Sequence, residues 1–189
     1  PFCQDSSVIC AAVETCRRVV AASFSPLNAL YACNEVIPPA ADQLDVALLR
    51  LSSTLKLDTP LWKYLSGLYQ TRCSSCQHPV DADYFIWERE NNRPAKVYYT
   101  CRMCHHKGLQ DVTEQDLRRL ESIEEREFHY AYVLSRLAGK SEKGQKFDRG
   151  LLDLYTRRNL YALTVLLIKI ETLFADSEMI SPLRLLLLR

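Results

Sequence analysis

The chain has 189 residues, 48% of them hydrophobic and 25% charged, so it can bury a core and is not disordered by composition. Its formal net charge of +1 excludes a whole-chain electrostatic argument for nucleic-acid binding, and any such argument must be local. One domain with an insertion and two small domains both fit this length.

The first elements along the chain predict an α/β unit. A loop leads into a helix that runs from Ser7 to about Cys16, and residues 17–24 read as a short buried strand. Ser25 and Pro26 then cap the next helix. A helix, a strand and a helix in this order are typical of α/β folds with a parallel sheet.

Three short motifs in this unit follow one another in a familiar order. They are Pro1-Phe2-Cys3, Arg17-Arg18-Val19-Val20 and Ser25-Pro26-Leu27. In this order they resemble the cofactor-binding unit of S-adenosylmethionine-dependent DNA methyltransferases of the adenine-specific, amino-methylating kind. Members of that family that carry a zinc ribbon also resemble this chain at residues 153–163. The resemblance implies a partial Rossmann-like methyltransferase unit with an inserted ribbon and a mostly helical remainder.

The cofactor motif departs from the family pattern at several positions. A glycine-rich turn lets the backbone approach the cofactor closely, but this chain has Gln4, Asp5 and Ser6 there. The family's acidic residue after the second strand corresponds to Ser23, and its glycine before that strand corresponds to Cys16. The eroded cofactor motif therefore comprises Pro1, Phe2, Cys3, Gln4, Asp5, Ser6 and Ser23, and we do not expect it to bind S-adenosylmethionine.

The family's catalytic loop, Asp/Asn-Pro-Pro-Tyr/Phe, has no counterpart in the sequence, so we name no catalytic residue. Pro38-Pro39 is flanked by Ile37 and Ala40 and does not qualify. The abrupt start and end of the chain suggest a fragment of something longer, in which that loop could lie beyond Arg189. Whether the methyltransferase-like chain is an enzyme (EC 2.1.1 class) stays open, although we expect this chain to be inactive.

Two helices are predicted before the ribbon. Apolar residues repeat with helical spacing from Ala41 to Lys56, and Thr59-Pro60 caps a short helix at Leu61–Leu65. Both read as ordinary core helices.

Two Cys-x-x-Cys pairs then frame a predicted β-hairpin. Their residues are Cys73, Cys76, Cys101 and Cys104, and four thiolates complete the tetrahedral shell of a structural zinc ion. Residues 84–87 and 97–100 are rich in β-formers, and residues 90–94 between them form the turn. The sequence thus predicts a zinc ribbon with one zinc per chain; unrelated free cysteines are the alternative. His105 and His106 directly follow Cys104 and could be taken for ligands, but with four thiolates available they read as neighbours of the site or as surface residues.

The remaining cysteines, Cys3, Cys10, Cys16 and Cys33, lie in apolar, helix-like surroundings where a free thiol packs as a small hydrophobe. Reduced cysteines favour an intracellular location, which means the cytoplasm if the protein is prokaryotic. No signal-peptide pattern is present. The apolar tail at Leu183–Leu188 is too short to span a bilayer, so we expect no membrane contact.

Local charge makes DNA a candidate partner of the ribbon. Residues 70–110 contain six basic and four acidic side chains, and Trp87, Tyr98 and Tyr99 are interleaved with them. Basic groups could hold phosphates while the aromatic rings stack on bases. Zinc ribbons that serve protein contacts or stability alone are the equally weighted alternative. The candidate contacts in this segment are Arg72, Arg102 and Lys107.

The segment after the ribbon reads as mostly helical. Thr113 and Asp116 predict a capping box at the start of a helix that runs to about Leu137. A polar loop follows, and its Lys140, Lys143 and Lys146 are further candidate DNA contacts. Thr156 caps a last long helix from Arg157 to Phe174. Arg157 and Arg158 occupy its first turn, where an anion such as phosphate, or a salt bridge to Asp153, would offset the helix dipole.

We therefore predict three parts: a methyltransferase-like unit with a helical extension at 1–69, the ribbon at 70–111, and a helical segment at 112–189 that returns to the methyltransferase-like body. The predicted function is a degenerate, zinc-binding DNA-methyltransferase homologue that contacts DNA or bridges subunits of a larger assembly. The protein partner would be another chain or the missing remainder of a longer one. The alternatives are a fragment of an active DNA methyltransferase and a structural zinc-ribbon interaction module.

Overall fold

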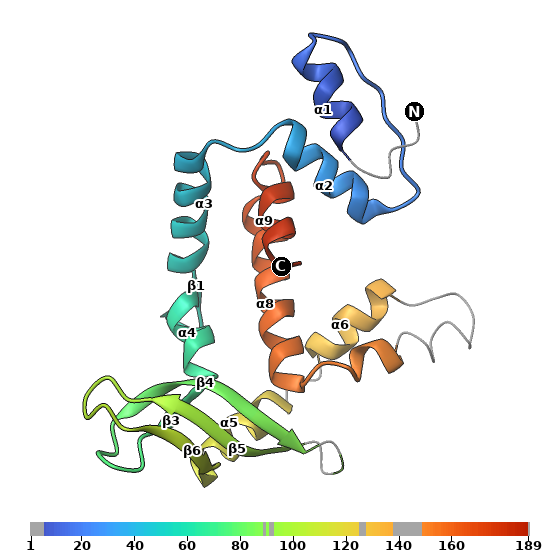
Figure 1. Cartoon of the computed structure of the whole chain (residues 1–189). Helices are drawn as coiled ribbons and strands as arrows, with labels where there is room; N and C mark the ends of the chain where they lie inside the picture. Colours follow the sequence, from blue (N-terminus) through green and yellow to red (C-terminus); the bar gives the residue numbers. More distant parts are fainter. Residues whose placement is uncertain (1–5, 89, 91–92, 125–127, 138–148, 189) are drawn as a thin grey trace. The chain divides into compact units, whose positions relative to one another are not determined.

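The computed structural model describes residues 6–88, 90, 93–124, 128–137 and 149–188, and mixes helices with a small antiparallel sheet. The chain divides into two compact units, with residues 1–52 and 167–189 in unit 1 and residues 53–166 in unit 2 (Figure 1). None of the described helices combines the length and the apolar character that a membrane-spanning segment requires.

Unit 1 is helical. Its elements are α1 (Ser7–Glu14), α2 (Pro26–Val36), most of α3 (Ala41–Ser53), the end of α8 (Arg157–Leu173) and α9 (Ile180–Leu186). The predicted cap of α2 is confirmed, because the Ser25 side chain accepts a hydrogen bond from the Asn28 amide. Asn34 donates to Ser181 Oγ over 3.0 Å and thereby ties α2 to α9.

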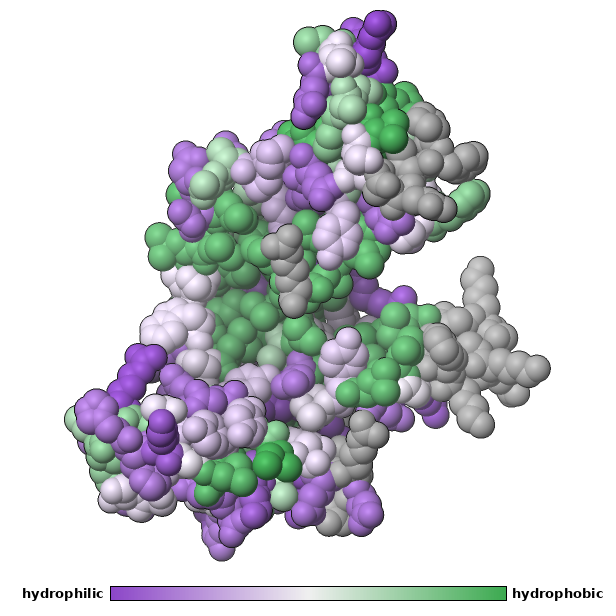
Figure 2. All heavy atoms as spheres, viewed as in Figure 1, coloured by the Kyte–Doolittle hydropathy of each residue, from purple (hydrophilic) through white to green (hydrophobic). Residues whose placement is uncertain are grey.

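The strand predicted at residues 17–24 is wrong. Only an isolated bridge residue, Ala22, marks this stretch, and Val20 and Phe24 are 90% and 93% exposed. An apolar strand needs a paired neighbour in a sheet, and every strand pair in the described residues is antiparallel and lies in unit 2. Other apolar side chains of unit 1 are also exposed, and Figure 2 shows apolar surface along α3.

Unit 2 begins with a short hairpin that was not predicted from the sequence. Strand β1 (Leu55–Lys56) pairs with β2 (Thr59–Pro60), and the turn residues Leu57 and Asp58 both have positive φ. Helix α4 (Leu61–Gly67) follows at the position expected for the short helix.

The ribbon forms a four-stranded antiparallel sheet in the order β3-β4-β5-β6 (Figure 1). The strands are β3 (Gln70–Arg72), β4 (Pro79–Glu88), β5 (Arg93–Thr100) and β6 (Lys107–Asp111). The predicted hairpin is confirmed as β4 and β5, which are longer than expected. A register shift between Ala82 and Tyr84 makes room for Asp83, whose carboxylate accepts a hydrogen bond from Thr100.

Helices complete unit 2. The predicted capping box is confirmed at α5 (Glu114–Glu124): the Thr113 amide donates to the Asp116 carboxylate, and the Asp116 amide donates to Thr113 Oγ1. The segment expected as one helix contains α5 and α6 (Phe128–Leu137), and residues 125–127 between them lie outside the described part. Thr156 caps α8 through the Asn159 amide, as predicted.

Candidate metal centre

The four predicted ligand cysteines lie together at one end of the ribbon. Their sulfur atoms are all within 4.8 Å of one another. The Sγ atoms of Cys73 and Cys104 are 3.6 Å apart, and so are those of Cys76 and Cys101. Tetrahedral zinc with Zn–S bonds of about 2.3 Å requires sulfur–sulfur distances of about 3.8 Å. The cluster is therefore compatible with one structural zinc ion.

The two Cys-x-x-Cys segments have the same backbone geometry. In each, the amide of the first cysteine donates to the carbonyl five residues later, from Cys73 to His78 and from Cys101 to His106. In each, the residue after the second cysteine is left-handed, with φ 59° at Gln77 and φ 59° at His105. This turn is present in both Cys-x-x-Cys segments, which we call the first and second knuckle, and it brings the two thiols of each knuckle to the same side. Each knuckle therefore supplies two of the four ligands.

Amide groups of the knuckles act on the thiol pKa values. Burial tends to raise the pKa of Cys73, but the amides of Cys76 and Ser75 and the neighbouring thiols of Cys104 and Cys76 outweigh it and lower that pKa to about 6. The pKa of Cys101 is also lowered, chiefly by the amide of Cys104. These amides therefore stabilise negative sulfur, which is the form that binds a metal.

Cys76 holds its proton in the metal-free cluster. The His78 amide tends to lower its pKa, but burial and the thiols of Cys104, Cys101 and Cys73 together raise it to about 12. Zinc must displace that proton when it binds.

Tyr99 supports the first knuckle from inside the sheet. Its side chain is fully buried, and its hydroxyl accepts a 2.8 Å hydrogen bond from the Ser74 amide while lying 2.9 Å from Ser74 Oγ. It also donates to Gln110 Oε1, and Gln110 in turn donates to the Arg72 carbonyl. The expectation that Tyr99 could stack on a base is wrong, because the inward-facing ring is not accessible.

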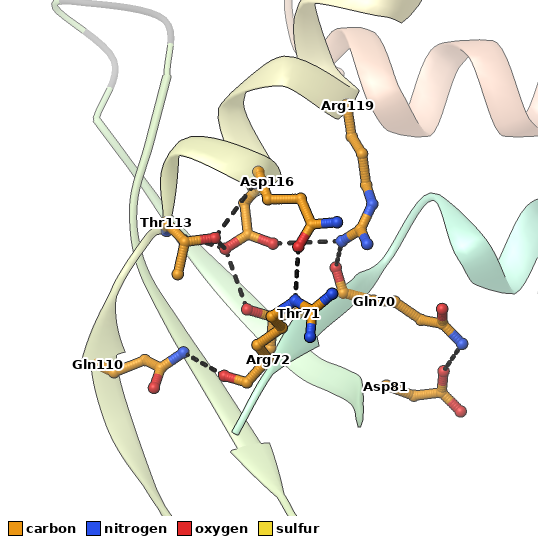
Figure 3. Close-up of polar contacts among 9 residues, drawn as sticks. Gln70, Thr71, Arg72, Asp81, Gln110, Thr113, Asp116 and Arg119 are labelled. Atoms are coloured by element: carbon orange, nitrogen blue, oxygen red, sulfur yellow. Dashed lines mark hydrogen bonds and ion pairs between the residues drawn. The ribbon is translucent and has the colours of Figure 1, made fainter. Parts of the chain in front are cut away.

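A polar network joins β3 to α5 (Figure 3). Asp116, 1% exposed, accepts through Oδ2 from Thr71 and Thr113, and its Oδ1 lies 3.4 Å from Arg119. Arg119 also donates to the Gln70 carbonyl. The sequence predicts Asp116 only as a capping residue, since nothing in the local pattern relates it to Thr71, 45 positions earlier.

The predicted basic contacts occupy different environments. Arg72, Arg102 and Lys107 are exposed near the metal ligands, and Arg72 also donates to Gln115 and to the Gln77 carbonyl. Arg157 is exposed, whereas Arg158 is only 2% exposed. Lys140, Lys143 and Lys146 lie outside the described residues.

The described part of the eroded cofactor motif consists of Ser6 and Ser23, since Pro1, Phe2, Cys3, Gln4 and Asp5 lie outside it. Ser23 lines a cavity of about 270 Å³ in unit 1. The described residues that line this cavity carry no charged side chain; they are Ile9, Ala21, Ala22, Ser23, Asn28, Ala29, Ala32, Cys33, Val36 and Ile37.

The other described cysteines are free thiols. Cys10 is partly buried, and Cys16 and Cys33 are exposed. Their burial is therefore shallower than their apolar surroundings in the sequence suggested.

Compared with protein-family models, with curated proteins and with solved structures, the chain matches none of them.

Proposed function

We propose that residues 70–111 form a structural zinc ribbon in a degenerate DNA-methyltransferase homologue, which uses the ribbon to contact DNA or to bridge subunits. The observation that carries the zinc site is the sulfur cluster, because four thiols within 4.8 Å would repel one another as thiolates without a cation. Four sulfur ligands leave no open coordination position, so the metal supplies folding energy and no chemistry.

The experiment on the metal uses the full chain purified with zinc in the medium. Mass spectrometry of metals should return one zinc per chain, and cobalt substitution should give the visible absorption of a tetrahedral thiolate site. Cys104→Ser should lose the metal, whereas Cys33→Ser, at an exposed cysteine outside the cluster, should retain it. Equal metal content in both variants would contradict the assignment of the four cysteines as zinc ligands.

Support for the methyltransferase relationship comes from the motif order at Pro1-Phe2-Cys3, Arg17-Arg18-Val19-Val20 and Ser25-Pro26-Leu27. Support for lost activity comes from the substituted glycines and from the cavity beside Ser23. A cofactor with an amino-acid moiety and a ribose needs charged or hydrogen-bonding partners, and among the described residues that line the cavity the polar side chains are those of Ser23 and Asn28. The Rossmann-like sheet of such a unit would need strands in addition to those of the described residues.

Calorimetry with S-adenosylmethionine separates this proposal from a fragment of an active enzyme. The degenerate homologue should give no heat of binding. Micromolar binding would favour the active alternative and would contradict loss of the cofactor site.

DNA contact is assigned to the exposed Arg72, Arg102 and Lys107 at the zinc end of the ribbon. If they hold phosphates, DNA affinity should fall steeply with salt, and Arg102→Gln should reduce the slope of log affinity against log salt by about one. An Arg93→Gln variant, at the far end of the hairpin, is the matched control. Salt-independent binding, or no binding, would remove DNA from the proposal.

A protein-interaction module is the second candidate, and one surface favours it. Tyr84 and Tyr98 stack on the exposed face of the sheet with ring centroids 5.1 Å apart, and Leu109 lies next to Tyr98 across the strand pair. Tyr84 and Leu109 are 53% and 47% exposed. Aromatic and apolar side chains of this kind are typical of protein contacts.

A further inference from the structure

Arg158 is a buried cation with unsatisfied hydrogen-bond donors. It lies in the first turn of α8, and it is the only Lys or Arg among the buried residues of the described chain. Its guanidinium carbon is 4.3 Å from the ring centroid of Phe85 and 5.6 Å from that of Tyr69. The two rings stabilise the positive charge, but the face of an aromatic ring offers no acceptor to N–H groups that lie in the guanidinium plane. Nε and Nη1 are accordingly buried without a hydrogen-bond partner.

A carboxylate that acts on Arg158 already has other hydrogen-bond partners. Asp116 acts electrostatically on Arg158, but its Oδ2 accepts from Thr71 and Thr113 and its Oδ1 pairs with Arg119. Arg119 adds a second positive charge that also acts on Arg158. Two guanidinium groups and one carboxylate thus act on one another, and the three side chains together carry a net charge of +1.

An excess buried charge is costly. Burial lowers the pKa of Arg158, yet a guanidinium does not give up its proton in a protein. Burying a charge without a partner is strongly unfavourable, and buried polar groups are normally satisfied. A bound anion would remove this cost.

We propose that Arg158 and Arg119 bind a phosphate group at the amino-terminal end of α8. Phosphate offers more acceptor oxygens than a carboxylate, and guanidinium groups bind it through charge-assisted hydrogen bonds. The 17-residue helix α8 adds the positive end of its dipole. The side chain of Arg119 is 27% exposed, so the anion reaches the cluster from the side of Arg119. This site does not depend on DNA contact by the ribbon.

The test observes the Arg158 side chain directly in the zinc-loaded full chain. The Nε–Hε resonance is assigned by its loss in Arg158→Lys, and inorganic phosphate is titrated at constant ionic strength against sodium chloride. A saturable shift of this resonance, with a larger rise in melting temperature than chloride gives, is the expected result. Arg157→Gln removes an exposed charge from the same helical turn and should leave the saturable shift intact. Arg158→Lys should weaken phosphate binding about tenfold or more, because it loses the planar fork.

A 5′-phosphorylated dinucleotide in place of inorganic phosphate distinguishes the source of the phosphate group. Tighter binding of the dinucleotide supports a nucleotide phosphate, and equal or weaker binding supports the free ion. An Arg158 resonance that stays still in both titrations, while those of exposed arginines move, overturns the inference. The wild-type titration gives this answer even if Arg158→Lys does not fold, because its Nε–Hε signal is then assigned by through-bond experiments.

Discussion

The hydroxyl of Thr71 in β3 donates a 3.0 Å hydrogen bond to Oδ2 of Asp116 in α5, and the two residues are 0% and 1% exposed. The same oxygen accepts from the amide and hydroxyl of Thr113. One carboxylate therefore both caps α5 and attaches that helix to the ribbon.

Asp116→Ala should destabilise unit 2 by about 3 kcal/mol, because it leaves the buried hydroxyl of Thr71 and the partly buried donors of Thr113 without an acceptor. Urea unfolding of the zinc-loaded protein measures the change. Glu114→Ala removes an exposed carboxylate from the same turn, where it pairs with Arg118, and should cost less than about 0.5 kcal/mol. Equal costs for the two variants would mean that the Thr71 contact is not stabilising.

Tyr99→Phe tests the support of the first knuckle. The change removes a buried hydroxyl that contacts Ser74 and Gln110, so we expect a loss of about 1–2 kcal/mol in unfolding free energy. Zinc should also leave the variant faster in the presence of a chelator. Tyr98→Phe, on the opposite and exposed face, should be close to neutral, and a similar loss there would contradict the assignment.

The sequence predicted local features well because their causes are local. Cysteine spacing, the Thr113–Asp116 capping box and the Ser25 cap each depend on residues a few positions apart, and all are present in the structure. The strand at residues 17–24 failed for the converse reason. A β-rich run becomes a strand only when another segment pairs with it, and Val20 has no such neighbour in the described part of unit 1.

The environment of Arg158 was beyond sequence reasoning for the same physical cause. Its contacts with Tyr69 and Phe85 join residues more than seventy positions apart, so periodicity placed it only on the first turn of a helix. The methyltransferase relationship and DNA contact remain predictions.

Zinc binding should weaken as the pH falls, because protons compete for the thiolates. The pKa of Cys73 is lowered to about 6 and that of Cys76 is raised to about 12 in the metal-free cluster. Between these values zinc uptake must release the Cys76 proton, and below about 6 it must also release the Cys73 proton. Competition with a chelator across this range should therefore show an affinity that falls with decreasing pH, and more steeply below about pH 6. A pH-independent affinity would contradict thiol ligation.

His105→Gly tests whether His105 is a metal ligand or only a neighbour of the metal site. His105 is exposed and has φ 59°, a conformation that costs a non-glycine residue about 1 kcal/mol. If the four thiols are the ligands, the variant should keep one zinc per chain and gain up to about 1 kcal/mol in stability. Metal analysis and urea unfolding together check this, and loss of zinc would instead make His105 a ligand.

Cys16→Gly should stabilise unit 1. After α1 ends, Cys16 is left-handed with φ 56°, the Cys16 amide donates to the Val13 carbonyl, and the Arg17 amide donates to the Ala12 carbonyl. This pair of bonds is the Schellman ending, in which glycine avoids the steric cost of a Cβ atom. We expect a gain of about 1 kcal/mol in unfolding free energy, measured as slower hydrogen exchange of the α1 amides.

Cys10→Gly, inside α1, is the control and should instead lower the unfolding free energy by about 1 kcal/mol, because there glycine only adds freedom to the unfolded chain. The two substitutions remove the same side chain, so opposite signs would show that backbone conformation, and not loss of a thiol, determines the effect; two losses would contradict the strain at Cys16.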